Sequence, residues 1–98
     1  MTITKKMNGT TLEIALEGRL DTITAPELDA ELNKDMPGAD SLVLDFSKLD
    51  YISSAGLRVL LSTQKTMNRQ GTMKLIGVSE TIMEIFEITG FCDILTFE

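Results

Sequence analysis

Two adjacent serines, Ser53 and Ser54, carry the most specific chemistry in this chain, because they precede a run of apolar residues at helical spacing. A serine at the start of a helix commonly accepts a hydrogen bond from a free backbone amide, which contributes about 1 kcal/mol. A phosphoryl group on such a serine would also lie beside free amides at the positive end of the helix dipole, and would add about −1.5 to −2 charges there. The local pattern therefore allows a helix cap, a phosphorylation site, or both.

Gly56 follows in the first turn of this expected helix. Because glycine has no side chain, the backbone of another protein could come close to the serine hydroxyls at this point. The same absence of a side chain would also give the helix room to pack against a sheet. The sequence leaves both interpretations open.

Residue counts exclude several kinds of active site. The chain has no histidine, so it has no Ser-His-Asp triad, no histidine-ligated metal and no phosphohistidine. No nucleophile is paired with a base, no glycine-rich phosphate loop is present, and the single cysteine, Cys92, has no evident activating neighbour. We therefore expect a protein that is not an enzyme and that holds no cofactor or metal.

Length, composition and charge predict one domain over residues 1–98, since 98 residues are close to the size of a single domain. Hydrophobic residues make up 43% and charged residues 24%, as in globular proteins. The net charge of −6 argues against duplex nucleic-acid binding, which needs clustered Lys and Arg. No apolar run approaches the roughly 20 residues that span a bilayer, and the N-terminus lacks a signal-peptide core. We expect a cytoplasmic protein without membrane insertion.

Alternating and continuous apolar runs predict the strands. Residues 11–17 alternate apolar and polar side chains, and Asn8-Gly9 before them is a strong turn signal, so residues 2–7 and 11–17 should form a hairpin. The apolar run at 41–46 predicts a central strand that is buried on both faces and parallel to a neighbour. Further strands are expected at residues 73–76 and, as a last edge strand, 93–97.

Helix start and stop signals predict three helices. The first starts at Thr24, whose hydroxyl and Glu27 would form a capping box. The second covers residues 54–70, and the third follows Ser79. Strand and helix alternate in the second half of the chain, which predicts right-handed crossovers and an α/β fold. The inward face of the third helix should carry Ile82, Ile85, Phe86 and Thr89.

Residues 49–61 resemble the signature of STAS domains, and among them that of the small stand-alone anti-sigma factor antagonists of bacteria. Other stretches agree in order and spacing. Residues 18–25 resemble the Gly-x-Leu-Asp loop of that family, and the strand at 42–46, with the Asp-x-Ser-x-Leu stretch at 45–49, stands where its central strand stands. Residues 71–77 and 86–91 match its later strand, helix and turn. The resemblance covers essentially the whole chain, and it implies an α/β fold in which a mixed sheet of about four or five strands packs with three or more helices.

The resemblance also implies a partner-switching function. In that family the unphosphorylated protein binds an anti-sigma factor that is also an ATP-dependent serine kinase, and a sigma factor is freed. The kinase phosphorylates a serine of the antagonist, the complex separates, and a PP2C-type phosphatase restores binding. By position, the phosphoacceptor falls on Ser54, and the acidic position of the first loop falls on Asp21. The partner-binding residues that the resemblance implies are Asp21, Thr22, Ser53, Ser54, Gly56, Leu57 and Arg58.

The chain departs from the family pattern at three places. Ser53 stands where an Asp usually precedes the acceptor, which makes Ser53 an alternative phosphoacceptor. Arg58 stands where some relatives carry Gly, and it is either a partner contact or a solvated helix residue. The sequence stops at Glu98, where many relatives continue into a final helix, and the uncovered face leaves homodimer formation open.

Two other functions remain as alternatives. Asp45, at the end of the expected central strand, could be compared with the phosphoacceptor of a receiver domain. Receivers also need an acidic pair after their first strand and a late lysine, which this chain does not arrange, so loop capping is the favoured interpretation of Asp45. The second alternative is a STAS protein-binding subunit of an ABC transporter or of a stress-signalling assembly. In that case Ser54 would be an unphosphorylated helix residue.

Overall fold

The N-terminal hairpin forms where the turn signal places it. In the computed structural model, which describes residues 1–98, β1 (Thr2–Asn8) pairs antiparallel with β2 (Thr11–Leu20). Asn8 lies opposite Thr11, and Gly9 between them has a φ of 61°, a left-handed conformation that glycine adopts without strain. The predicted hairpin is confirmed.

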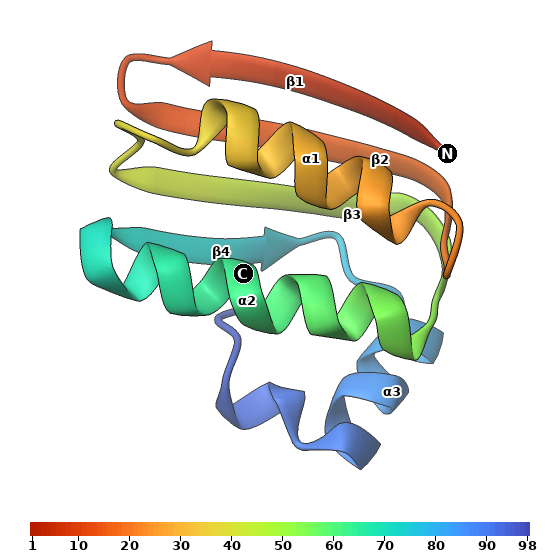
Figure 1. Cartoon of the computed structure of the whole chain (residues 1–98). Helices are drawn as coiled ribbons and strands as arrows, with labels where there is room; N and C mark the ends of the chain where they lie inside the picture. The colour runs from red at the N-terminus through yellow and green to blue at the C-terminus, as the bar shows by residue number, and fades with distance from the viewer.

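The sheet has four strands in the order β1-β2-β3-β4, and β3 (Ser41–Ile52) is parallel to both β2 and β4 (Thr72–Ile76). The expectation for residues 41–46 was partly wrong. β3 is twelve residues long; its side chains alternate between half-buried and buried over residues 41–46, and in its second half only Leu49 and Ile52 are buried. The reason is that helices cover only one face of the sheet (Figure 1), so only every second side chain is enclosed over residues 41–46.

Two helices lie side by side across the covered face (Figure 1). They are α1 (Ala25–Asp35) and α2 (Ser54–Gln70), and each fills the core with an apolar stripe. The fully enclosed side chains of these stripes include Leu28, Leu32, Leu60 and Met67. The predicted α/β fold, a mixed sheet packed with three helices, is confirmed.

The third helix, α3 (Glu80–Thr89), lies at the lower right in Figure 1 and contacts β3. Its Phe86 is buried, with its ring centroid 6.5 Å from that of Phe46 and 5.5 Å from that of Phe97. Ser79 caps α3 as predicted, because its hydroxyl accepts a hydrogen bond from the Ile82 amide at 3.3 Å. Thr89 was wrongly expected to face inward: it is exposed, at the end of the helix where the core is already closed.

The last predicted strand, at residues 93–97, is also wrong. A short 3-10 helix, η1 (Phe91–Asp93), follows Gly90, and only one bridge joins Phe97 to Leu75 of β4. Phe91 and Phe97 lie beside Phe86, so packing of aromatic rings determines the path of this segment. No helix in the chain combines the length and the apolarity needed to cross a membrane.

The topology brings together the two loops that follow the C-terminal ends of β2 and β3. Because β2 and β3 are parallel, the loops that follow them leave from the same edge. Leu20, at the end of β2, is the register partner of Ile52, at the end of β3. The β2–α1 loop therefore lies beside the start of α2, the segment that contains Ser53 and Ser54.

Candidate functional site

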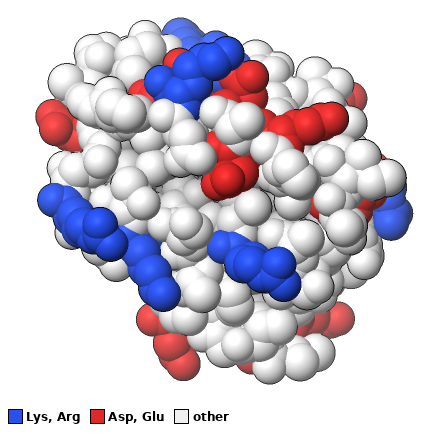
Figure 2. Space-filling model, in the orientation of Figure 1, with Lys and Arg blue, Asp and Glu red and all other residues white.

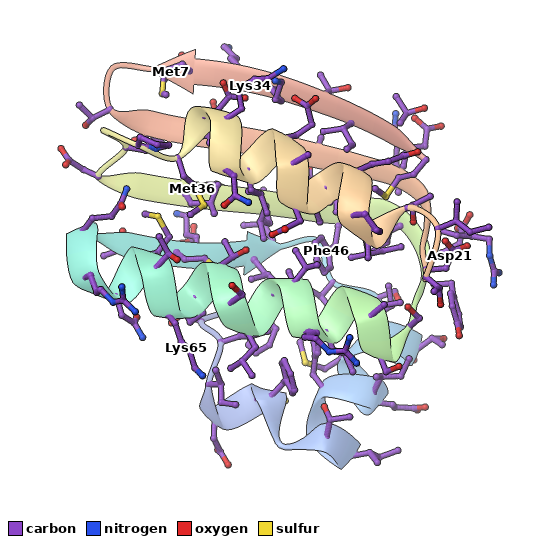
Figure 3. All side chains as sticks on the ribbon, in the orientation of Figure 1. Met7, Asp21, Lys34, Met36, Phe46 and Lys65 are labelled. Carbon is purple, nitrogen blue, oxygen red and sulfur yellow. The ribbon has the colours of Figure 1, made fainter.

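Asp21 organises the loop between β2 and α1. Its Oδ1 accepts hydrogen bonds from the amides of Ile23 and Thr24, both at 3.0 Å, and lies 3.1 Å from the Thr24 hydroxyl oxygen. The hydrogen bond from the Thr24 amide is the main reason why the pKa of Asp21 is lowered, and the Ile23 amide and the nearby Arg19 add to it. Asp21 is therefore held as a carboxylate in a fixed position at this end of the molecule (Figure 3).

The expected capping box at Thr24 is not present. The Thr24 side chain makes no capping hydrogen bond to α1. Its hydroxyl instead donates to the Arg19 carbonyl oxygen at 2.7 Å and accepts from the Asp21 amide at 2.8 Å. Asp21 and Thr24 thus exchange hydrogen bonds across the loop, and the loop geometry takes the place of a helix cap.

Ser53 and Ser54 have different environments. Ser53 is the N-cap of α2: its backbone is extended, and its Oγ accepts a hydrogen bond from the Gly56 amide at 3.4 Å. Ser54 is the first residue of α2, and it is exposed, whereas Ser53 is half-buried. Ser53 therefore caps the helix, whereas the exposed Ser54 does not supply the cap.

Gly56 faces the sheet and not the solvent. It is buried, and a Cβ atom built on it would lie 2.8 Å from Leu20 Cγ and 2.9 Å from Ile52 Cγ1. Leu57 beside it is 8% exposed and belongs to the core. The structure thus favours the packing interpretation of Gly56 over the idea that it opens access to the serines. Both residues hold the first turn of α2 against the ends of β2 and β3.

A groove runs between the N-terminal halves of α1 and α2. It has a volume of ≈ 470 Å³. Thr22 and Arg58, which the sequence also singled out, are exposed and line it. The other lining residues are Ala25, Pro26, Asp29, Ala55, Val59 and Ser62. The groove is therefore continuous with the β2–α1 loop and with the first turn of α2.

Two exposed apolar side chains near this loop were not predicted from sequence. Ile23 is 79% exposed, and Tyr51 is 38% exposed. The guanidinium of Arg19 lies 4.2 Å from the centroid of the Tyr51 ring. The position of Ile23 within the otherwise polar stretch 21–24 was a sequence signal from which its exposure could have been predicted. The contact between Arg19 and Tyr51 depends on the pairing of β2 with β3, which the sequence alone does not show.

Residues considered for other chemistry have structural roles. Asp45 Oδ1 accepts a hydrogen bond from the Ser47 amide at 2.9 Å, which agrees with the capping interpretation. Burial is the main cause that raises the pKa of the Cys92 thiol, with Glu87 and Asp93 adding to it, so its thiolate is disfavoured. No group of three or more His, Cys, Asp or Glu side chains is arranged to hold a metal.

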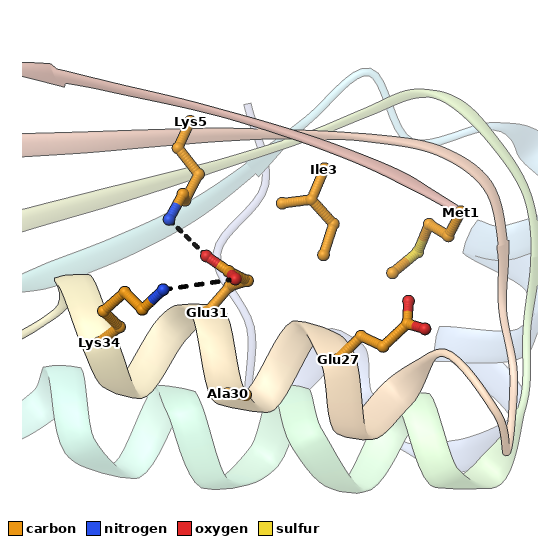
Figure 4. A pocket seen from close by; sticks show the side chains of 7 residues that line it. All are labelled: Met1, Ile3, Lys5, Glu27, Ala30, Glu31 and Lys34. Atoms are coloured by element: carbon orange, nitrogen blue, oxygen red, sulfur yellow. Dashed lines mark hydrogen bonds and ion pairs between the residues drawn. The ribbon is translucent and has the colours of Figure 1, made fainter.

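The largest hollow lies elsewhere, between β1 and α1, with a volume of ≈ 610 Å³ (Figure 4). Lys5 and Lys34 both point toward Glu31 there, and the Lys34 Nζ lies 3.8 Å from Glu31 Oε1. Lys5 Nζ also lies 2.7 Å from Asp35 Oδ2. The two contacts of Lys5 attach β1 to α1, whereas the Lys34–Glu31 pair lies within α1. None of the predicted site residues lines this hollow.

Comparison with known proteins identifies the family. The model of the STAS domain family matches residues 2–98. The anti-sigma factor antagonist BtrV of Bordetella bronchiseptica, so named provisionally, is 42% identical over 81 residues, which is 81% of this chain and 70% of BtrV. The anti-sigma-B factor antagonist of Staphylococcus aureus is 32% identical over 85 residues, or 85% of this chain and 79% of that protein. The chain belongs to the STAS domain family, as the sequence resemblance indicated.

Solved structures show the same fold. An anti-sigma factor antagonist from Mycobacterium paratuberculosis superimposes with a TM-score of 0.89 at 18% identity, over 98% of this chain and 83% of that one. Unphosphorylated SpoIIAA, an anti-sigma factor antagonist, gives a TM-score of 0.79 at 18% identity, over 99% of this chain and 87% of SpoIIAA. The arrangement of four strands and three helices is thus the STAS fold.

Proposed function

We propose that this protein is an anti-sigma factor antagonist. Its unphosphorylated form binds an anti-sigma factor through the β2–α1 loop and the first turn of α2, and a sigma factor is released. The observation that carries the proposal is the exposed hydroxyl of Ser54, at a helix start that Ser53 already caps, beside the loop that Asp21 organises. The names of both curated relatives support it.

In this proposal, phosphorylation of Ser54 ends the binding. The anti-sigma factor acts as the kinase: the γ-phosphoryl group of ATP is transferred to Ser54 Oγ, ADP leaves, and the hydroxyl proton is released. The added charge of about −1.5 to −2, enclosed in an interface near a carboxylate, costs several kcal/mol and is enough to dissociate a partner. A PP2C-type phosphatase would remove the group. The ATP site belongs to the partner, so this chain itself is not an enzyme.

The geometry supports a switch that needs no refolding. Ser53, not Ser54, supplies the capping oxygen of α2, so a phosphoryl group on Ser54 leaves the cap intact. The Ser53 hydroxyl is half-buried and engaged with the Gly56 amide, which makes Ser53 the poorer acceptor. Ser54 is therefore favoured over the alternative acceptor Ser53.

A pull-down from native lysate tests this function. Wild-type protein and the Ser54→Asp variant serve as baits, and mass spectrometry identifies the bound proteins. We expect the wild type to recover a small ATPase-kinase and Ser54→Asp to recover much less of it. Purified kinase and ATP should then add one phosphate to the wild type, mapped to Ser54. Equal recovery of a transporter ATPase by both baits would instead support the non-phosphorylated STAS subunit.

A further inference from the structure

Arg58 lies one helical turn after Ser54 on the exposed face of α2. Both residues are exposed and are four positions apart, and side chains at this spacing are neighbours, with Cβ atoms about 5–6 Å apart. Helical side chains lean toward the N-terminus of their helix. This spacing and direction bring the turn that begins with Ser54 within reach of the Arg58 side chain, which lines the adjoining groove.

Arg58 has no carboxylate partner in the protein. The ion pairs of the structure use other cations, namely Lys5, Arg19, Lys34 and Lys74. Asp29 of α1 lines the same groove as Arg58, but the two side chains form no ion pair. Asp21, in the neighbouring loop, already accepts hydrogen bonds from Ile23 and Thr24 and faces Arg19. No side chain of the unphosphorylated protein neutralises the guanidinium of Arg58.

The charge of α2 differs from that of the rest of the chain. The chain has a net charge of −6, yet α2 contains no Asp or Glu and carries Arg58, Lys65 and Arg69. Figure 2 shows blue side chains spread over the region of α2, separated by white surface only. An anion at Ser54 would therefore find its charge complement on its own helix and not across the molecule.

We propose that Arg58 binds the phosphoryl group of phosphorylated Ser54 and holds it against α2. This inference rests on the proposed function for the identity of the acceptor. A guanidinium can donate two parallel hydrogen bonds to phosphate oxygens, a geometry that lysine cannot reproduce. Arg58 is thus a positioning residue for the phosphoryl group. It stabilises the dianion and fixes the direction in which the group extends from the surface.

Phosphorus NMR tests this contact without a kinase. Phosphoserine is incorporated at position 54 during translation of the full chain, and the second phosphate pKa is measured by titration. We expect Arg58→Ala to raise this pKa by about 0.3 to 0.5 relative to the wild-type background, because an exposed ion pair of modest strength is lost. Arg58→Lys should restore part of the difference. Lys65→Ala, which removes the same charge about two turns further along α2, should leave the pKa unchanged.

The outcomes separate this inference from the proposed function. Equal phosphate pKa values in the wild type and in Arg58→Ala, or equal effects of Arg58→Ala and Lys65→Ala, would overturn the contact. Circular dichroism of each variant shows that the fold is retained. Phosphosite mapping with the purified kinase tests the proposed function independently, because it reads which serine is modified and not how the phosphate is held.

Discussion

The Ser53 amide donates a hydrogen bond of 2.9 Å to the Leu20 carbonyl oxygen. This bond joins the end of β3 to the end of β2, immediately before α2 begins and immediately before Asp21. It holds the acidic loop and the candidate phosphoacceptor in a fixed relationship, although more than thirty residues separate them in the sequence. The partner surface that we propose is therefore built on backbone hydrogen bonding and does not depend on a flexible loop.

Substitutions of Ser53 and Ser54 should have different effects on phosphorylation and on stability. Ser54→Ala should retain anti-sigma factor binding and lose phosphorylation, because it removes only an exposed hydroxyl. Ser53→Ala should lower the free energy of unfolding by about 1 kcal/mol through loss of the helix cap, and should still be phosphorylated. Intact-mass measurement and urea unfolding give the two readouts. One phosphate on Ser54→Ala would show that another residue is the acceptor.

Gly56→Ala should destabilise the protein by about 1–3 kcal/mol, because the new methyl group would overlap Leu20 and Ile52. Ser62→Ala, on the exposed face of the same helix, is the matched control and should change stability little. Urea unfolding at constant pH measures both. A Gly56→Ala variant as stable as the wild type would mean that Leu20 and Ile52 can move to accommodate the methyl group, and would contradict the packing role of Gly56.

Asp21 should make stability depend on pH in the acidic range. Its pKa is lowered in the folded protein from the ordinary value of 3.8, so the carboxylate contributes stability above that value and loses it as the pH falls through the lower, folded pKa. Asp21→Asn keeps the shape and removes the charge. The stability difference between wild type and Asp21→Asn should therefore be present near neutral pH and vanish in strong acid. A difference that is independent of pH would contradict this account.

The stability that Lys5 contributes through Glu31 and Asp35 should be lost both in strong base and in strong acid. Hydrogen bonds to Asp35 and then Glu31 raise the pKa of Lys5 above 10.5, so its contribution holds at neutral pH and is lost as the pH rises through the folded pKa. The hydrogen bond from Lys5 lowers the pKa of Glu31 below 4.5, and that contribution is lost in acid. A double-mutant cycle of Lys5→Gln and Glu31→Gln measures the coupling, which should shrink in high salt.

The sequence determined those features that depend on a few adjacent residues. The turn at Asn8-Gly9 and the hydroxyl cap at Ser79 are local hydrogen-bonding and dihedral preferences, and they occur where predicted. A serine cap was also expected at the start of α2, but the sequence left it open between Ser53 and Ser54, and the structure assigns it to Ser53. The residues around Ser54 that resemble the STAS signature are likewise a local string, and the match of the STAS model over residues 2–98 confirms the family that they indicated. Local signals suffice where the partners of a group lie within one turn of chain.

Tertiary structure decided what depends on distant neighbours. Because β2 pairs with β3 as far as Leu20 and Ile52, β3 is longer than its apolar run. The same pairing encloses Gly56 against these two side chains and places the Asp21 loop beside Ser54. Thr24 lost its predicted cap because the Arg19 carbonyl and Asp21 compete for its hydroxyl within the folded loop. These outcomes depend on which strands pair and which face is covered. Hydrophobic burial across the whole chain fixes that choice, and no short window of sequence contains it.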